Sequence, residues 1–304
     1  MLSVVIPSRS DQYLQRTIDD LLEKAEGEVE IIVTLDGYWP NPMLRDDPRV
    51  IILHHGQLHN HVGMRGGINA AMEIASGDYV MKIDEHCMVD QGFDLKLAAD
   101  CEDNWVVIPR RYRLDPDAWQ LIEDGRPPVD YMYLASPFRK PDDVLYGLHG
   151  ALWNERHHER KDNLIDDTMS WQGSCYFMKK KYWFDLLHPL DDENYGPFTQ
   201  EAQEIGNKVW LSGGRLVVNK KTWYAHYHKG KRGKGLGFSN EQYKRHQADT
   251  EKGRRYCIDF WLNNKWDKRN HDFEWLIEKF WPVPKWPDNW RQLQAAYMEQ
   301  AYAN

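Results

Sequence analysis

The sequence has no long apolar run and few cysteines among its 304 residues. No stretch approaches the roughly 18 apolar residues of a membrane-spanning helix, and residues 1–7 lack the basic and apolar regions of a signal peptide. The four cysteines are widely spaced without a C-x-x-C pair, which argues against a zinc site and a disulfide framework. We therefore expect a cytosolic protein without a membrane partner.

Positive charge is also scarce, with 39 Lys and Arg against 47 Asp and Glu and a formal net charge of -8. Proteins that coat nucleic acid bind phosphates through Lys and Arg, so this balance argues against that class. The hydrophobic content of 41% allows a sizeable core. A folded domain is expected, in which a local basic segment could still bind an anion.

Strand-like and helix-like patterns alternate in the first third of the chain. Short β-branched runs predict strands, and apolar residues three and four apart predict helices. The expected strands cover residues 2–6, 29–35, 50–53 and 79–83, and the expected helices cover residues 11–24, with Asp11 as candidate N-cap, and 63–75. Such alternation predicts an α/β fold with a parallel sheet.

Polar residues follow three of these strands, at 7–9, 36–37 and 84–86. Ligands of parallel sheets sit beyond the carboxyl ends of the strands, so we expect these residues to border one crevice. Asp84 and His86 are two residues apart and can share one cation. By itself, this D-x-H pattern is more typical of a capped turn with a surface histidine.

The pattern weakens between about residues 105 and 170, where Pro, Asp and aromatic residues predict long connections. Regular patterns resume after residue 170. They predict strands at 171–178 and 215–218, the latter leading into 223–228, and helices at 182–187 and 201–211. Beyond about residue 245, six tryptophans and three prolines lie in polar sequence. We interpret this part as a C-terminal extension.

Residues 63–87 resemble a known family. They read G-M-R-G-G-I-N-A-A-M, then A-S-G-D-Y, then a strand ending in D-E-H-C. The order and spacing are similar to the nucleotide-sugar half of GT-A glycosyltransferases of the family-2 type, and the D-x-H-C form resembles the polypeptide N-acetylgalactosaminyltransferases. Residues 201–214, E-A-Q-E-I-G-N-K-V-W-L-S-G-G, are similar to the helix E-N-L-E-I-S-x-R-V-W-x-x-G-G of those enzymes.

The resemblance covers about residues 2–92 and 170–230 and implies a GT-A fold, with a Rossmann-like, mostly parallel sheet flanked by helices. The expected parts are a GT-A domain at 1–245, divided into a donor-binding part at about 1–92 and an acceptor-side part at about 93–245, and a Trp-rich, helical or irregular extension at 246–304. The segment F-W-P-V-P-K-W-P at 280–287 resembles phage-encoded glycosyltransferases. We therefore expect the cytosol of a bacterium or a phage-infected host.

The resemblance assigns Asp84, His86 and His226 as ligands of one metal ion, because His226 lies twelve residues past Gly214, where the family places its third ligand. A mixed oxygen and nitrogen shell suits Mn²⁺ better than Mg²⁺. The metal would bridge the diphosphate of a UDP-sugar and neutralise the leaving group. His228 is a rival third ligand, since alternation along a strand lets both histidines face one side. The spacing favours His226.

The resemblance also implies a donor site, made of Pro7, Ser8, Arg9, Asp36, Arg65, Asp84, Glu85, Lys231 and Arg232. Asp36 would bond the uracil and ribose, and Arg65 would lie near the diphosphate. Lys231 and Arg232 belong to a Gly-rich basic segment, which we interpret as a lid. The alternatives are an ordinary turn at Asp36, and a solvated basic loop or a DNA contact at the lid.

Glu201 is the candidate catalytic residue. Inverting family-2 enzymes carry an E-D pair whose Asp is the general base, and that Asp aligns with Ala202 here. Glu201 would orient the acceptor or act as base, or else be a solvent-facing acid. The missing base favours retention, in which the leaving phosphate accepts the proton. Other candidate bases are Asp191, Asp192 and Glu193, and the expected acceptor-side residues are Trp171, Gln172 and Gly173.

We therefore expect a metal-dependent hexosyltransferase that moves a sugar from a UDP-sugar to an acceptor hydroxyl. The acceptor would be a hydroxymethylated base in phage DNA, a protein or a glycan. The alternative is a non-catalytic carbohydrate- or nucleic-acid-binding module on a similar fold, which the tryptophans and the basic segment would suit. A nucleotidyltransferase would carry a Gly-rich loop after the first strand, which residues 7–10, P-S-R-S, do not match.

Overall fold

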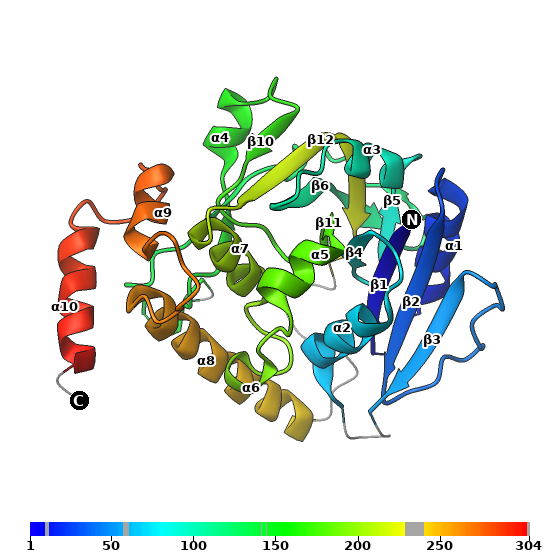
Figure 1. Cartoon of the computed structure of the whole chain (residues 1–304), viewed down its shortest axis with the longest axis horizontal. Helices are drawn as coiled ribbons and strands as arrows, with labels where there is room; N and C mark the ends of the chain where they lie inside the picture. Colours follow the sequence, from blue (N-terminus) through cyan, green and yellow to red (C-terminus); the bar gives the residue numbers. More distant parts are fainter. Residues whose placement is uncertain (10–11, 57–60, 141, 144, 229–239, 303–304) are drawn as a thin grey trace.

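The computed structural model describes residues 1–9, 12–56, 61–140, 142–143, 145–228 and 240–302 (Figure 1). The strands are β1 (Leu2–Ser8), β2 (Val29–Asp36), β3 (Val50–His55), β4 (Tyr79–Ile83), β5 (Cys87–Val89), β6 (Trp105–Asp115), β7 (Gln120–Leu121), β8 (Met132–Leu134), β9 (Gly150–Leu152), β10 (Ile165–Asp167), β11 (Cys175–Lys179) and β12 (Arg215–His226). The helices are α1 (Leu14–Lys24), α2 (Gly63–Ile74), α3 (Phe93–Ala99), α4 (Asn154–Glu159), α5 (Lys180–Tyr182), α6 (Asp192–Tyr195), α7 (Glu201–Leu211), α8 (Asn240–Leu262), α9 (Phe273–Lys279) and α10 (Trp290–Tyr302), with a π-helical turn at Trp183–Leu187.

A mixed, mostly parallel sheet forms the centre of the molecule, with the order β10-β12-β6-β11-β4-β1-β2-β3. Strand β1 runs parallel to β2 and β4, β2 to β3, and β6 to β12. Strand β11 runs antiparallel between β4 and β6. This arrangement confirms the expected α/β fold with helices on a mostly parallel sheet.

Each face of the sheet carries its own apolar core, because successive side chains of a strand point to opposite faces. Val4 and Ile31 pack with α1 and α3, whereas Val5 and Ile32 pack with α2, α7 and α8. Figure 1 shows α1 on the far side of the sheet from α7 and α8. The carboxyl ends of β1, β2 and β4 point to the edge where α2 begins.

Two expectations for the middle of the chain were wrong. Residues 105–115 form β6 in the interior of the sheet, where a long connection was expected. Pro109 lies opposite Asn219, where the pairing with β12 shifts register, so the proline is accommodated at an irregularity. Strand β11 begins at Cys175, and residues 171–174 form a loop instead of the expected strand.

Two other element ends differ from the expected ones. Strand β12 extends past Val218 to His226. Helix α1 begins at Leu14, and the candidate cap Asp11 lies outside the described residues.

The Trp-rich C-terminal part is helical and belongs to the core. Trp261, Trp286 and Trp290 are buried in the same cluster as Val5 and the other residues of that face of the sheet. The indole of Trp286 donates a 2.7 Å hydrogen bond to the carbonyl of Leu134. Helix α8 crosses residue 245, and the division into 1–245 and 246–304 stays a prediction. Within the described residues, no helix is long and apolar enough to cross a membrane.

Candidate active site

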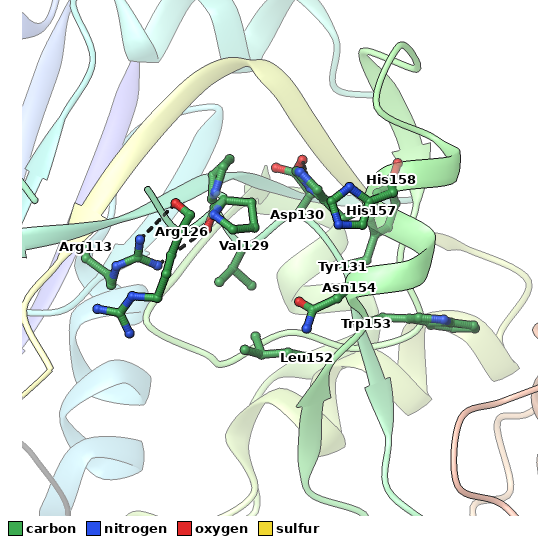
Figure 2. A pocket seen from close by; sticks show the side chains of 12 residues that line it. Arg113, Arg126, Val129, Asp130, Tyr131, Leu152, Trp153, Asn154, His157 and His158 are labelled. Carbon is green, nitrogen blue, oxygen red and sulfur yellow. Dashed lines mark hydrogen bonds and ion pairs between the residues drawn. The ribbon is translucent and has the colours of Figure 1, made fainter. Parts of the chain in front are cut away.

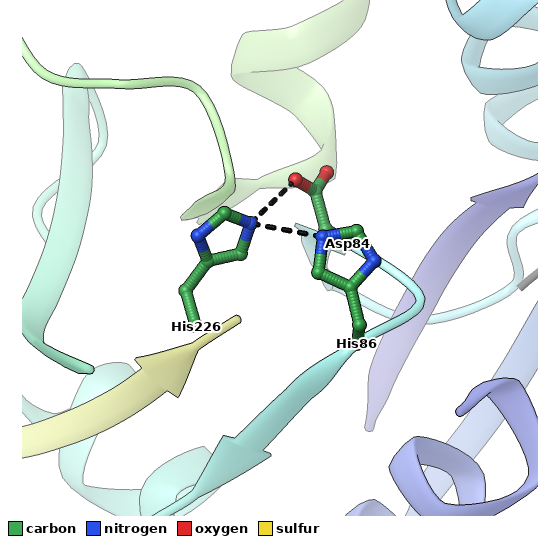
Figure 3. Close-up of side chains that lie close together, drawn as sticks. All are labelled: Asp84, His86 and His226. Atoms are coloured by element: carbon green, nitrogen blue, oxygen red, sulfur yellow. Dashed lines mark hydrogen bonds and ion pairs between the residues drawn. The ribbon is translucent and has the colours of Figure 1, made fainter. Parts of the chain in front are cut away.

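Asp84, His86 and His226 meet at the ends of three strands (Figure 3). Asp84 follows β4, His86 precedes β5, and His226 ends β12. Strands β5 and β12 pair with His226 opposite Cys87, which places His226 beside His86. The Nε2 atoms of the two histidines lie 3.1 Å apart, and His226 Nε2 lies 3.2 Å from Asp84 Oδ2.

These three side chains fit a divalent metal ion. Their ligand atoms all lie within 4.8 Å of one another. Ligand bonds of about 2.1 Å place two ligands of one ion roughly 3 to 4 Å apart, so the observed separations need little change. One carboxylate oxygen and two imidazole nitrogens suit Mn²⁺ or another transition metal better than Mg²⁺.

His226, and not its rival His228, lies in this cluster. His228 instead accepts a 3.1 Å hydrogen bond from Arg111 Nη1, and its ring lies 4.9 Å from the ring of His226. Burial lowers the pKa of His226 to about 3. The imidazole of His226 is therefore uncharged at neutral pH and keeps the lone pair that a metal ligand needs.

Lys82 connects this cluster to Glu201. Its Nζ atom lies 2.6 Å from Asp84 Oδ1, 2.9 Å from the carbonyl of Gly173 and 3.4 Å from Glu201 Oε2. Burial alone would lower the pKa of Lys82, but Asp84 and Glu201 raise it above its ordinary value. Burial would raise the pKa of Asp84, yet Lys82 and His226 hold it well below its ordinary value. Lys82 and Asp84 are therefore both ionised.

A cavity of about 970 Å³ opens over these residues. It is large enough for a nucleotide-sugar together with part of an acceptor. Of the residues singled out from the sequence, its lining includes Pro7, Ser8, Arg9, Asp36, Asp84, Glu85, His86, Trp171, Gln172, Gly173, Glu201 and His226. The fold therefore brings these twelve residues to one place.

Two carboxylates, Glu85 and Asp36, lie at the end of the cavity where the expected donor residues are found. Glu85 accepts hydrogen bonds from the Ser8 hydroxyl and, at 3.1 Å, from the backbone amide of Arg9. Asp36 accepts hydrogen bonds from the amides of Val62 (2.8 Å) and Gly63 (3.0 Å), and so fixes the start of α2. Gly63 has a φ of +81°, a backbone conformation that favours glycine, and a Cβ there would lie 2.2 Å from Pro197 Cβ.

Arg65 does not line this cavity. Its side chain is completely buried, its Nη1 pairs with Glu204, and its Nη2 donates a 2.7 Å hydrogen bond to the carbonyl of Thr199. The guanidinium also lies 4.7 Å from the centre of the Tyr195 ring. The sequence predicted that Arg65 lies beside a diphosphate, and this differs in the structure. Arg65 instead joins α2 to the loop before α7.

Glu201 lies at the start of α7 and is 5% exposed, so it is not a solvent-facing acid. Burial raises its pKa, against the opposing effect of Lys82. The rival acids Asp191, Asp192 and Glu193 are not among the residues that line the cavity. Ala202 does line it, without offering a carboxylate.

Trp171 lines the cavity although it is only 4% exposed, whereas Gln172 is exposed. Lys231 and Arg232, the expected lid, lie outside the described residues.

Sequence reasoning missed one wall of the cavity, on α8. His246, Gln247, Thr250, Glu251 and Arg254 line it, at helical spacing. Gly253 makes this possible, because a Cβ there would lie 2.3 Å from the carbonyl oxygen of Tyr195. Lys82 was also missed, although a lysine two residues before Asp84 in an apolar strand was a visible signal.

A second cavity, of about 310 Å³, lies beside α4, with Arg113 and Arg126 at one end and His157 and His158 at the other (Figure 2). Its buried Asp130 accepts hydrogen bonds of 2.7 and 2.8 Å from Arg110. None of the candidate metal, donor or catalytic residues lines it.

Comparisons with known proteins found similar chains. A Drosophila melanogaster protein, named among the polypeptide N-acetylgalactosaminyltransferases, is 25% identical in an alignment of 243 residues that covers 71% of this chain and 40% of the relative. The crystal structure of GalNAc-T7 with UDP, GalNAc and Mn²⁺ matches with a TM-score of 0.65 and 16% identity, over 92% of this chain and 56% of that one. S. aureus TarS matches with a TM-score of 0.50 and 13% identity, over 90% and 41%.

The chain thus spans less than two thirds of the length of each of these relatives. The two structural matches show that it has their fold. The sequence profile of Glycosyl transferase family 2 matches residues 3–187, which is more than half of the chain. The chain belongs to glycosyl transferase family 2.

Proposed function

We propose that the protein transfers a sugar from a UDP-sugar to an acceptor hydroxyl, with a divalent metal ion held by Asp84, His86 and His226. The observation that carries this proposal is the convergence of their three ligand atoms, within 4.8 Å, on the cavity that the donor-side residues also line. GalNAc-T7, whose fold this chain shares, was crystallised with UDP, GalNAc and Mn²⁺, which supports Mn²⁺ and a uridine nucleotide.

The chain's own residues suit the steps of such a transfer. A bound metal ion would supply charge stabilisation to the leaving diphosphate. Ser8, Arg9 and Asp36 would hold the nucleotide, and Glu201 would orient the acceptor hydroxyl or accept its proton. Ala202 stands where an inverting base is expected, so we favour retention of the anomeric configuration.

The charges around the cavity favour an uncharged acceptor, such as a glycan or protein hydroxyl, over modified DNA. The lining carries five carboxylates and three cationic side chains: Asp36, Asp84, Glu85, Glu201 and Glu251 against Arg9, Lys82 and Arg254. A polyanionic acceptor binds through an excess of Lys and Arg. Lys231 and Arg232, outside the described residues, do not enter this balance.

The test is release of UDP from a panel of UDP-sugars, with and without Mn²⁺, followed by an acceptor panel. We expect release that depends on Mn²⁺, stops with EDTA and is lost in Asp84→Ala. The matched control is Asp78→Ala, an exposed carboxylate just before the same strand, which should leave release unchanged. Folded protein that neither binds nor hydrolyses any UDP-sugar would refute the proposal and favour the non-catalytic binding module.

A further inference from the structure

Lys82 is a buried cation beside the candidate metal ligands. It lies in β4, and alternate residues of a strand point the same way, so Lys82 and Asp84 face the same side of the sheet. The side chain is 1% exposed. An ammonium group donates three hydrogens, and its three acceptors are Asp84 Oδ1, the Gly173 carbonyl and Glu201 Oε2.

Packing alone gives no reason for a lysine here. The neighbouring strand residues Val80, Met81 and Ile83 are apolar and completely buried. A buried ammonium is unfavourable compared with a hydrophobic residue of similar volume unless its charge is needed. The two carboxylates that it contacts are the candidate metal ligand and the candidate catalytic residue, so the need for charge lies in the active site.

The ammonium balances the one carboxylate among the three metal ligands. Asp84 and Lys82 form an ion pair without net charge, and the imidazoles of His86 and His226 add no negative charge. A metal ion that enters alone therefore meets a weakly attractive site, with a cation within hydrogen-bond distance of its only charged ligand. A diphosphate brings the negative charge that the site lacks.

We propose that Lys82 makes metal binding depend on the nucleotide, so that Mn²⁺ binds weakly alone and tightly together with the diphosphate of UDP. This inference rests on the proposed function, since it takes Asp84, His86 and His226 as the metal ligands. Coupling of this kind is reciprocal, so Mn²⁺ strengthens UDP binding by the same factor as UDP strengthens Mn²⁺ binding. Lys82 thereby acts through Asp84 as a positioning residue.

The experiment measures free Mn²⁺ by electron paramagnetic resonance during titration of the whole protein, with and without saturating UDP. In the wild type, UDP should raise the affinity for Mn²⁺ by at least about tenfold. Lys82→Met leaves two carboxylates without their shared cation, so this variant should bind Mn²⁺ without UDP at least about tenfold more tightly than the wild type. The effect of UDP on the affinity should shrink accordingly.

Lys220→Met is the matched control. Lys220 is a second buried lysine, also 1% exposed, that donates a 2.7 Å hydrogen bond to the carbonyl of Arg160 and lies 3.9 Å from Asp130. It does not line the larger cavity. Its replacement should lower stability without changing the Mn²⁺ affinity or the effect of UDP.

A tighter Mn²⁺ site is a result that simple damage to the fold would not produce. Lys82→Gln, which keeps a hydrogen-bond donor but no charge, repeats the test with less disturbance of the packing. If both folded variants bind Mn²⁺ no more tightly than the wild type while the wild type binds Mn²⁺ with UDP, the inference is overturned and the proposed function stands. If the wild type binds no Mn²⁺ even with UDP, the proposed function fails, and the inference with it.

Discussion

The Nε2 atoms of His86 and His226 lie 3.1 Å apart, although 140 positions separate the two residues in the sequence. Strand pairing produces this contact, because His226 lies opposite Cys87 in the β5–β12 ladder. Two imidazole nitrogens at this distance share either a proton or a metal ion. Asp84 Oδ2, at 3.2 Å from His226 Nε2, supplies the charged ligand that favours the metal.

Replacing His226, which ends β12, and replacing His228, in the loop that follows, should affect metal binding differently. His226→Ala removes a ligand, so we expect Mn²⁺ binding in the presence of UDP to weaken at least about tenfold. His228→Ala removes contacts with Arg111, Gln172 and the His226 ring but no metal ligand, so it should have a much smaller effect. Calorimetric titration of both variants measures the difference. Equal losses, or a larger loss in His228→Ala, would show that the third ligand is misassigned.

Glu201→Gln should lower kcat for transfer, because it removes the carboxylate that orients the acceptor hydroxyl. A loss of about 10² to 10⁴, the usual contribution of general base catalysis, would show that Glu201 also accepts the proton and would argue against retention. Its folding should be retained, since glutamine has the same size. Asp192→Asn tests the rival carboxylate and should leave kcat unchanged, because Asp192 does not line the cavity. Steady-state kinetics with the acceptor found in the panel separates the two. A loss of kcat in Asp192→Asn alone would contradict this assignment.

Local patterns predicted much of the fold, and long-range contacts explain what was missed. The helix expected at 201–211 has the bounds of α7, and strands β1, β2 and β4 were expected within a few residues. Strand β6 was missed because it is held by pairing with β12, about 110 positions later in the chain, and its Pro109 lies at an irregularity of that pairing. A single sequence holds no sign of that partner.

The site was predicted less completely than the sheet. The D-x-H pattern and the resemblance gave Asp84, His86 and His226, which the fold brings together. The acceptors of Lys82 on Gly173 and Glu201 lie 91 and 119 positions away, so its role depends on contacts that sequence spacing does not reveal. The α8 wall was missed for the same reason.

Arg65 should contribute to stability and not directly to donor binding. Arg65→Met breaks its buried pair with Glu204, and leaving one partner of such a pair costs about 3 kcal/mol in the free energy of unfolding. The double variant Arg65→Met/Glu204→Gln should recover part of this loss. Urea unfolding measures the stability, and KM for the UDP-sugar should stay within about twofold under conditions where the variant is folded. Unchanged stability with a raised KM would restore the donor role.

Acid should destabilise the metal-free protein through His226. Its pKa in the folded protein is lowered by burial to about 3, against about 6.5 in the unfolded chain. The unfolded chain therefore binds more protons as the pH falls below about 6.5, and the free energy of unfolding decreases toward pH 3. One such histidine accounts for about 1 to 2 kcal/mol between pH 6.5 and 5. In EDTA, His226→Gln should show a shallower decrease than the wild type, and parallel curves would contradict this source of acid sensitivity.

The metal site is the central claim, and anomalous diffraction from crystals grown with MnCl₂ and UDP tests it most directly. We predict one strong Mn²⁺ peak within about 2.3 Å of Asp84 Oδ2, His86 Nε2 and His226 Nε2, next to the diphosphate of UDP in the larger cavity. Bound UDP without a peak at these three atoms, or a peak held by other residues, would contradict the account.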